Sequence, residues 1–273
     1  MTKQRLISQK LSEIAVSAGN LDVANIKNLL QKENPVILEI GANCGQTTID
    51  FVQHFPNAII HCFEPDPRAI KKFKRLVNHP NVFLHEIAIG NSNGTITFHQ
   101  SAGGEAIDPE GWDHSGSIRA PKAHLEMFPW VRFDNKIEVP IMRLDDWANQ
   151  HSIDQVDFIW ADVQGAEGDM INGAFETLRK TRFIYTEYYN NECYDGQIPL
   201  TDIYALLNQF LIIAKYENDV LFENFLLNQK LPSNLLEDFI KNALKSENSS
   251  KFFECYGATS DFLEKNLKGF KHD

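Results

Sequence analysis

The stretch from residue 36 to residue 85 alternates short apolar runs with amphipathic segments, and no other feature of the chain constrains its fold as strongly. The apolar runs have the length and composition of buried parallel strands, and they cover residues 36–40, 58–63 and 82–85. The intervening segments, 47–55 and 66–77, have helical spacing, and Asp66-Pro67 supplies an N-cap followed by proline at the first helical position. This order predicts an α/β fold with a doubly wound sheet.

The second half of the chain continues the pattern and ends on a closely linked pair of strands. Further strands are predicted at residues 137–142, 156–161, 183–186, 210–215 and 220–227, with helices at 166–179 and 200–208. Only four residues join the last two runs, which is too short for a parallel crossover. We therefore expect a mostly parallel sheet with one antiparallel strand near its end.

Three regions flank or interrupt this core. Residues 1–34 are predicted to form two amphipathic helices that break near Gly19, and residues 231–273 are predicted to form a helical C-terminal tail. Between them, residues 35–230 form the predicted main domain. Within it, residues 87–100 read as a hairpin around a turn at 91–94. Residues 101–135 lack periodicity but are rich in aromatics, which predicts a functional loop that closes over the site.

Composition excludes several classes of partner. The formal net charge of −11 disfavours general binding to nucleic acid, because an acidic surface repels phosphate backbones. No apolar run reaches the roughly 18 residues of a membrane span, and the first twenty residues lack the apolar core of a secretory signal. The four cysteines have no metal-ligand spacing. We expect a cytoplasmic protein with reduced thiols, and homo-oligomer formation remains open.

The glycine-containing turn after the first strand, Glu39-Ile40-Gly41-Ala42-Asn43-Cys44-Gly45, is the strongest functional signal. Its glycines can adopt positive φ and leave space beside the main chain, and the helix that follows offers free N–H groups to a carboxylate. Glu39 suits an ammonium group, whereas it would repel the pyrophosphate of a dinucleotide. The turn therefore favours a bound amino-acid moiety, although a tight strand-to-helix turn without a ligand is the alternative reading.

Two acids mark the ends of neighbouring strands. Glu64 ends the second strand and Asp162 ends the strand predicted to lie beside the first. Because the carboxyl ends of parallel strands face one crevice, both side chains should lie near the glycine turn. There, Glu64 can accept the two hydroxyls of a ribose. The alternatives are an exposed strand-end glutamate and a helix N-cap formed by Asp162 or Gln164.

Seven stretches together resemble the FkbM family of methyltransferases, which use S-adenosylmethionine (SAM). They are ILEIGANCGQT at 37–47, CFEPDP at 62–67, HEIAIGNSNGTITF at 85–98, SGS at 115–117, VPIMRLDDW at 139–147, DFIWADVQGAEGDMINGA at 157–174 and IYTEYYN at 184–190. The resemblance covers about residues 35–228. Two positions depart from it, since the family usually has lysine and glutamate where this chain has Trp160 and Gln164.

The resemblance implies the class I methyltransferase fold, a Rossmann-like seven-stranded sheet with one antiparallel strand. It also implies SAM as the methyl donor and a small-molecule or glycan acceptor, with transfer to an oxygen of a sugar or natural product. Combined with the strand-end and glycine-turn arguments, it gives the predicted cofactor-binding residues. They are Glu39, Gly41, Ala42, Asn43, Gly45, Gln46, Thr47, Glu64, Pro65, Ile87, Ala88 and Asp162.

Methyl transfer to a hydroxyl also needs a group that accepts the hydroxyl proton. The predicted catalytic residues are Asp162, His114 and Glu187, and His85 and Asp113 are further candidates. A divalent metal held by Asp162, Glu187 and Asp113 is an alternative, but three scattered acids support it weakly, so no metal is predicted.

Two other functions remain open at this stage. A nucleotide-dependent oxidoreductase could share such a sheet, but the spacing of Gly41 and Gly45 does not match the G-x-G-x-x-G pattern. A non-catalytic SAM-binding module is the second, because the departures at Trp160 and Gln164 fall beside the predicted site and a fold does not guarantee activity.

Overall fold

The computed structural model describes residues 11–12, 14–104 and 111–227. The chain divides into two compact units, Met1–Glu223 and Asn224–Asp273, and the first contains the hydrophobic cores and the candidate site. The predicted C-terminal tail and most of the first predicted helix lie outside the described residues.

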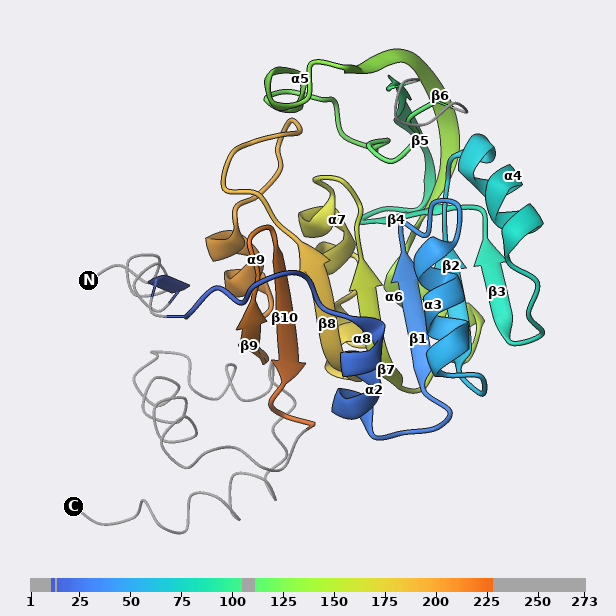
Figure 1. The fold of residues 1–273 in the computed structure, drawn as a ribbon, viewed down its shortest axis with the longest axis vertical. Helices are drawn as coiled ribbons and strands as arrows, with labels where there is room; N and C mark the ends of the chain where they lie inside the picture. Colours follow the sequence, from blue (N-terminus) through green and yellow to red (C-terminus); the bar gives the residue numbers. More distant parts are fainter. Residues whose placement is uncertain (1–10, 13, 105–110, 228–273) are drawn as a thin grey trace. The chain divides into compact units, whose positions relative to one another are not determined.

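A mixed seven-stranded sheet forms the centre of the first unit (Figure 1). From edge to edge the strands are β3 (Val82–His85), β2 (Ile59–Phe63), β1 (Val36–Ile40), β7 (Val156–Ala161), β8 (Thr181–Glu187), β10 (Asp219–Asn224) and β9 (Phe210–Lys215). The first five are parallel to their neighbours, and β10 is antiparallel to β8. This confirms the doubly wound, mostly parallel sheet with an antiparallel strand near its end.

Helices cover both faces of this sheet, and each face has its own core. Helices α2 (Val23–Leu30), α3 (Gln46–His54) and α4 (Pro67–Leu76) lie on one face, and α6 (Leu144–Gln150), α7 (Glu167–Asn172), α8 (Phe175–Arg179) and α9 (Leu200–Leu206) on the other (Figure 1). Adjacent strand residues point to opposite faces. Thus Ile37 packs in the cluster of Phe51, whereas Leu38 packs in the cluster of Trp147. Nearly continuous apolar strands follow from burial on both sides.

A second, three-stranded sheet corrects the predicted hairpin at 87–100. Its order is β4 (Ala88–Gly90), β6 (Val131–Arg143) and β5 (Gly94–Gly103), so β6 lies between the two strands expected to pair with each other. The bend at 91–93 passes the end of β6, where the Asn93 side chain accepts a hydrogen bond from the Arg143 backbone N–H (2.8 Å). The long β6 offers both edges to partners, which local turn signals cannot reveal. Figure 1 shows β5 and β6 above the carboxyl ends of the parallel strands.

Two other predicted elements have different limits. The single helix expected at 166–179 is two short helices, α7 and α8, that break at Gly173. A Cβ at Gly173 would lie 1.8 Å from the Gly90 carbonyl oxygen, so β4 approaches the chain too closely for a side chain there. Strands β5 and β6 also extend into both ends of the 101–135 segment, which otherwise contains the short helix α5 (His124–Met127).

For the residues that the structure describes, the N-terminal helices, the absence of a membrane span and the free cysteines can also be compared with the predictions. Helix α2 confirms the second of the two N-terminal helices, with Asp22 as N-cap. Within the described parts of the chain, no helix combines the length and apolarity that crossing a membrane requires. The cysteines among the described residues, Cys44, Cys62 and Cys193, are buried free thiols.

A pair of histidines, the buried His61 and the half-buried His85, packs against Trp147 of α6. Trp147 donates to Nδ1 of His85 (3.4 Å), so the proton of this neutral ring lies on Nε2, which contacts Nδ1 of His61 (3.1 Å). Burial lowers the pKa of each histidine from 6.5 to about 4, because the charged imidazolium loses its hydration. Protonation of His61 at Nδ1 would also leave two ring N–H groups facing each other, and protonation of His85 at Nδ1 would oppose the Trp147 N–H.

We therefore expect stability to fall as the pH decreases from about 6.5 to about 4. In that window the unfolded chain binds protons at His61 and His85 that the folded chain does not. The free energy of unfolding should decline by roughly 1.4 kcal/mol per pH unit for each such proton. Urea unfolding across this range should show a shallower slope for His61→Asn/His85→Asn than for the wild type. His54→Asn is the control, since the His54 ring lies on α3, apart from this pair, and contacts the carbonyl oxygen of Asp50. An unchanged slope in the double variant would contradict the assignment.

Candidate active site

The glycine turn between β1 and α3 brings protein elements together more closely than any side chain would allow. Gly41 has a φ of 89°, and a Cβ there would lie 1.9 Å from the Asp162 carbonyl oxygen. Gly45 has a φ of 87°, and a Cβ there would lie 2.5 Å from Val77 and 2.8 Å from Phe73. The first glycine thus lets the end of β7 approach the turn. The second lets α4 pack against the start of α3.

Glu39 lies beneath this turn and does not line the cavity above it. Its carboxylate accepts a hydrogen bond from Thr48 Oγ1 (2.5 Å) and contacts Cys62 Sγ (3.6 Å). A further bond from the Thr48 backbone N–H satisfies a donor at the start of α3. Burial raises the pKa of Glu39 to about 7. In this structure Glu39 therefore anchors the strand to the helix, and its predicted contact with the cofactor stays a prediction.

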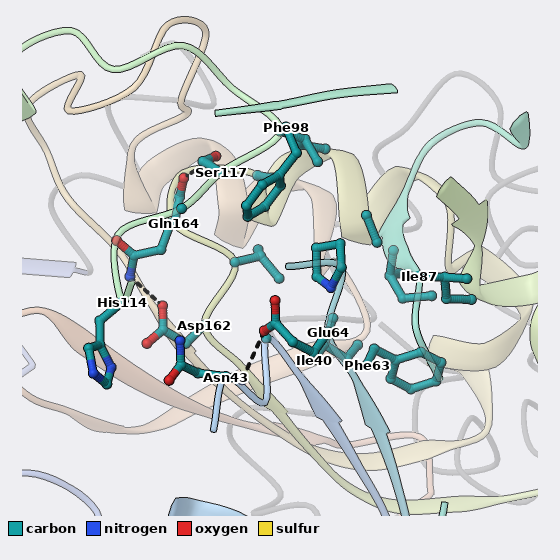
Figure 2. Close-up of a pocket in the computed structure, with 18 of the residues that line it drawn as sticks. Ile40, Asn43, Phe63, Glu64, Ile87, Phe98, His114, Ser117, Asp162 and Gln164 are labelled. Carbon is teal, nitrogen blue, oxygen red and sulfur yellow. Dashed lines mark hydrogen bonds between the residues drawn. The ribbon is translucent and has the colours of Figure 1, made fainter. Parts of the chain in front are cut away.

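Glu64, at the end of β2, holds its carboxylate at the floor of the cavity. Oε2 accepts the backbone N–H of Asn43 (2.9 Å), and Oε1 accepts that of Asp66 (2.7 Å). Figure 2 shows the bond to Asn43 and the carboxylate directed into the open space. Burial raises the pKa of Glu64 to about 8. Each carboxylate oxygen can accept more than one hydrogen bond, so both retain capacity for ligand hydroxyls.

The first cavity lies above the carboxyl ends of β1, β2 and β7 (Figure 2). The predicted cofactor residues that line it are Gly41, Asn43, Glu64, Pro65, Ile87, Ala88 and Asp162. The others, Glu39, Ala42, Gly45, Gln46 and Thr47, do not line it. Sequence reasoning missed Phe98 of β5 and Ser117, which close the cavity from the second sheet and from the 112–123 segment. The SGS stretch at 115–117 was the available signal for Ser117.

A second cavity adjoins the first and contains all three predicted catalytic residues. Its lining residues are Trp112, His114, Ser115, His124, Phe128, Trp130, Val131, Asp162, Gln164, Glu187 and Tyr189. Trp112 and Trp130 pack edge to face with ring centroids 4.9 Å apart. His114, Asp162 and Gln164 line both cavities. The 101–135 segment thus contributes walls to both cavities, as the prediction of a loop over the site requires.

Asp162 lies where the two cavities meet. Its side chain is exposed to solvent within the hollow, yet protein atoms surround it closely enough that desolvation raises its pKa. A hydrogen bond from Gln164 Nε2 (2.6 Å) and the nearby His114 oppose this rise. Glu187 is half-buried, and desolvation and the negative charge of Asp162 raise its pKa. The pair therefore places one accessible carboxylate beside a second that resists ionisation.

The two further candidates, His85 and Asp113, do not line the second cavity. His85 belongs to the histidine pair beside Trp147 and lines neither cavity. Asp113 lines the first cavity but not the second, and its carboxylate pairs with Lys72 (2.9 Å). Among the residues that the structure describes, no group of three His, Cys, Asp or Glu side chains is placed to hold a metal ion. The alternative metal site of Asp162, Glu187 and Asp113 is therefore not assembled here.

Comparison with known proteins identifies the class to which this fold and site belong. The model of the methyltransferase FkbM domain matches residues 39–223. The 2-O-methyltransferase NoeI of Sinorhizobium fredii is 48% identical over 204 residues, which cover 73% of this chain and 83% of that protein. The chain belongs to the FkbM methyltransferase family.

The chain is also similar to more distant proteins. Methyltransferase 1 of Beauveria bassiana is 24% identical over 148 residues, which cover 52% of this chain and 59% of that protein. The crystal structure of a methyltransferase FkbM from Methylobacillus flagellatus superimposes with a TM-score of 0.45 at 13% identity. That comparison covers 70% of this chain and 44% of the other.

Proposed function

We propose that this chain transfers the methyl group of SAM to a hydroxyl oxygen of a sugar or similar polyhydroxylated acceptor. The observation that carries the proposal is the junction of the two cavities at Asp162, because a donor in one and an acceptor in the other would meet at a proton-accepting group. Family membership supplies the reaction class. The name of the 48% identical relative, a 2-O-methyltransferase, supports oxygen as the receiving atom.

The residues of the first cavity fit SAM. The carboxylate of Glu64 can accept the two ribose hydroxyls while it keeps its bonds to Asn43 and Asp66. Apolar side chains of Ile87, Phe63 and Phe98 offer surface to an adenine ring. When bound, SAM supplies an activated methyl group on a positively charged sulfur. The acidic Asp162 at the cavity junction favours a cationic ligand there.

The second cavity fits a polyhydroxylated acceptor. Trp112, Phe128 and Trp130 provide flat apolar surfaces for a sugar ring, and Asp162 and Glu187 provide acceptors for its hydroxyls. Two carboxyl groups in the lining disfavour an anionic acceptor at this position. The chain's task is then alignment of the hydroxyl with the methyl group, together with removal of the hydroxyl proton.

Asp162 is the group best placed to take that proton. It lines both cavities and accepts the Gln164 amide through Oδ1, which leaves Oδ2 for the acceptor hydroxyl. The raised pKa makes its carboxylate a stronger base than an ordinary aspartate. His114 also lines both cavities and is the alternative base.

Ligand selectivity tests the cofactor assignment directly. SAM and S-adenosylhomocysteine should each raise the melting temperature of the purified protein, because a ligand bound only by the folded state stabilises it. At about 100 times Kd the stabilisation should reach about 2.7 kcal/mol. NAD and NADP serve as matched controls and should leave the melting temperature unchanged.

The same measurement separates the competing functions. Stabilisation by NAD without stabilisation by SAM would favour an oxidoreductase and contradict the methyltransferase proposal. Stabilisation by SAM without methyl transfer to any acceptor in a panel of sugars and glycans would instead favour a non-catalytic SAM-binding module.

A further inference from the structure

Gln164 follows the end of β7 and has an unusual backbone conformation. Its φ of 51° lies in the left-handed region, which non-glycine residues rarely adopt. Ser117 Oγ donates to the Gln164 carbonyl oxygen (2.7 Å) and fixes this conformation from the 112–123 segment. Gly165 follows with a φ of 89°, and a Cβ there would lie 2.7 Å from the Tyr194 side chain. The backbone thus directs the amide of Gln164 toward the cavity junction.

The side-chain amide of Gln164 has hydrogen-bond partners in three different parts of the chain. Nε2 donates to Asp162 Oδ1 (2.6 Å) and to Glu187 Oε2 (3.1 Å), so one NH₂ group joins two carboxyl groups (Figure 2 shows the bond to Asp162). Oε1 lies 2.9 Å from the Tyr194 hydroxyl, which is also 2.8 Å from the Ser115 carbonyl oxygen. Since only the nitrogen side can donate to carboxylates, these partners fix which way the amide points.

We propose that Gln164 is a positioning residue for proton removal, whose neutral amide holds Asp162 and Glu187 together and orients Asp162 toward the acceptor hydroxyl. This inference rests on the proposed methyl transfer. In that step the hydroxyl oxygen forms a bond to the methyl carbon, the carbon–sulfur bond breaks with its electron pair remaining on sulfur, and the hydroxyl proton passes to Asp162. Gln164 takes no part in the bonds that form or break, and it acts through Asp162.

The charges around Asp162 explain why a neutral donor is needed at this position. The titratable groups that interact with it electrostatically are His114, Glu167, Glu187, Tyr189, Tyr194 and Asp219. Three of these are carboxyl groups, whereas His114 is the one that lowers the pKa of Asp162. A further carboxylate at residue 164 would replace an attractive N–H···O contact of 2.6 Å by repulsion between like charges.

The variant Gln164→Glu tests the proposal through the pH dependence of the rate. The acidic limb of the kcat/KM profile should move up by about one to two pH units, since a like charge at hydrogen-bond distance raises the pKa of the base. At pH values below the limb the rate should fall about 10- to 100-fold, and it should recover at higher pH as Asp162 ionises. A loss of rate that is equal at every pH would overturn the positioning role.

A second substitution separates the contact with Asp162 from a change in net charge. Gln164→Glu/Glu187→Gln restores the original net charge, but it keeps a carboxyl group where the Gln164 amide donates to Asp162 at 2.6 Å. The acidic limb should therefore stay above the wild-type position. Gln53→Glu adds the same charge on the exposed surface of α3 and should leave the limb unchanged. If the double variant returns the limb to the wild-type position, the shift in Gln164→Glu reflects net charge alone and the proposal fails.

A measurement without acceptor separates this inference from the proposed function. The ¹³C carboxyl resonance of Asp162, identified by its loss in Asp162→Asn, should titrate at higher pH in Gln164→Glu than in the wild type. An unchanged titration would overturn the coupling of Gln164 to Asp162. A shifted titration in a protein that binds SAM but methylates no acceptor would uphold that coupling and overturn the methyl-transfer proposal.

Discussion

Asp162→Asn is expected to lower the rate of methyl transfer by about 10²–10⁴-fold, the contribution of a positioned general base. Asparagine keeps the shape of the side chain and the oxygen that accepts the Gln164 amide at 2.6 Å, but it cannot take a proton at neutral pH. The raised pKa of Asp162 should place the acidic limb of the wild-type profile above the range of an ordinary aspartate. That limb should be absent in the variant, as steady-state rates across pH 5–9 would reveal.

His114→Ala provides the comparison that assigns the base. The His114 imidazole is 37% exposed and lies 3.7 Å from Asp113, and both it and Asp162 line the two cavities. If Asp162 is the base, loss of His114 should have the smaller effect on rate, since it removes only a neighbour that favours ionised Asp162. A larger loss in His114→Ala than in Asp162→Asn would transfer the role to the histidine. SAM affinity must be measured for both, because a fall equal to the loss of kcat/KM would make Asp162 a cofactor ligand instead.

The sequence predicts the central sheet well because the relevant signals are local. Strands β1, β2 and β7 are nearly continuous apolar runs, and Asp66-Pro67 fixes the start of α4. The rule that parallel strands present their carboxyl ends to one crevice then brings Glu64 and Asp162 to the same cavity. No contact between distant elements had to be guessed for this part of the site.

Non-local contacts account for the predictions that differ from the structure. The partner of β4 is β6, about fifty residues later in the chain, so a turn signal at 91–94 suggested the wrong pairing. The amide of Gln164 meets Glu187 and Tyr194 only because β7, β8 and the segment after β8 come together in three dimensions. A sequence pattern identifies such residues but not their hydrogen-bond partners.

The location of the catalytic candidates shows the same dependence on tertiary structure. His114, Asp162 and Glu187 come from a loop segment and from the ends of two strands, and they converge on the second cavity. Their residue types predicted acid–base chemistry, whereas the aromatic wall of Trp112, Phe128 and Trp130 required the folded loop. The spatial relation between the cavities is therefore the new information on which the choice of Asp162 depends.

Glu64→Ala should weaken SAM binding roughly 10- to 150-fold without altering the fold. A hydrogen bond to a charged group contributes about 1.5–3 kcal/mol, and each 1.4 kcal/mol changes Kd tenfold. Because burial raises the pKa of Glu64 to about 8, hydroxyl donors that favour the ionised form should bind more tightly as the pH rises toward 8. Titration calorimetry at pH 6, 7 and 8 should show this trend in the wild type. This trend should be weaker in Glu64→Gln, which keeps one oxygen acceptor but does not titrate.

Circular dichroism must first establish that each variant of Glu64 is folded, since both carboxylate oxygens also accept hydrogen bonds from the backbone N–H groups of Asn43 and Asp66. Wild-type SAM affinity in a folded Glu64→Ala protein would remove the ribose assignment, and the search for the nucleoside contacts would then move to the other walls of the first cavity.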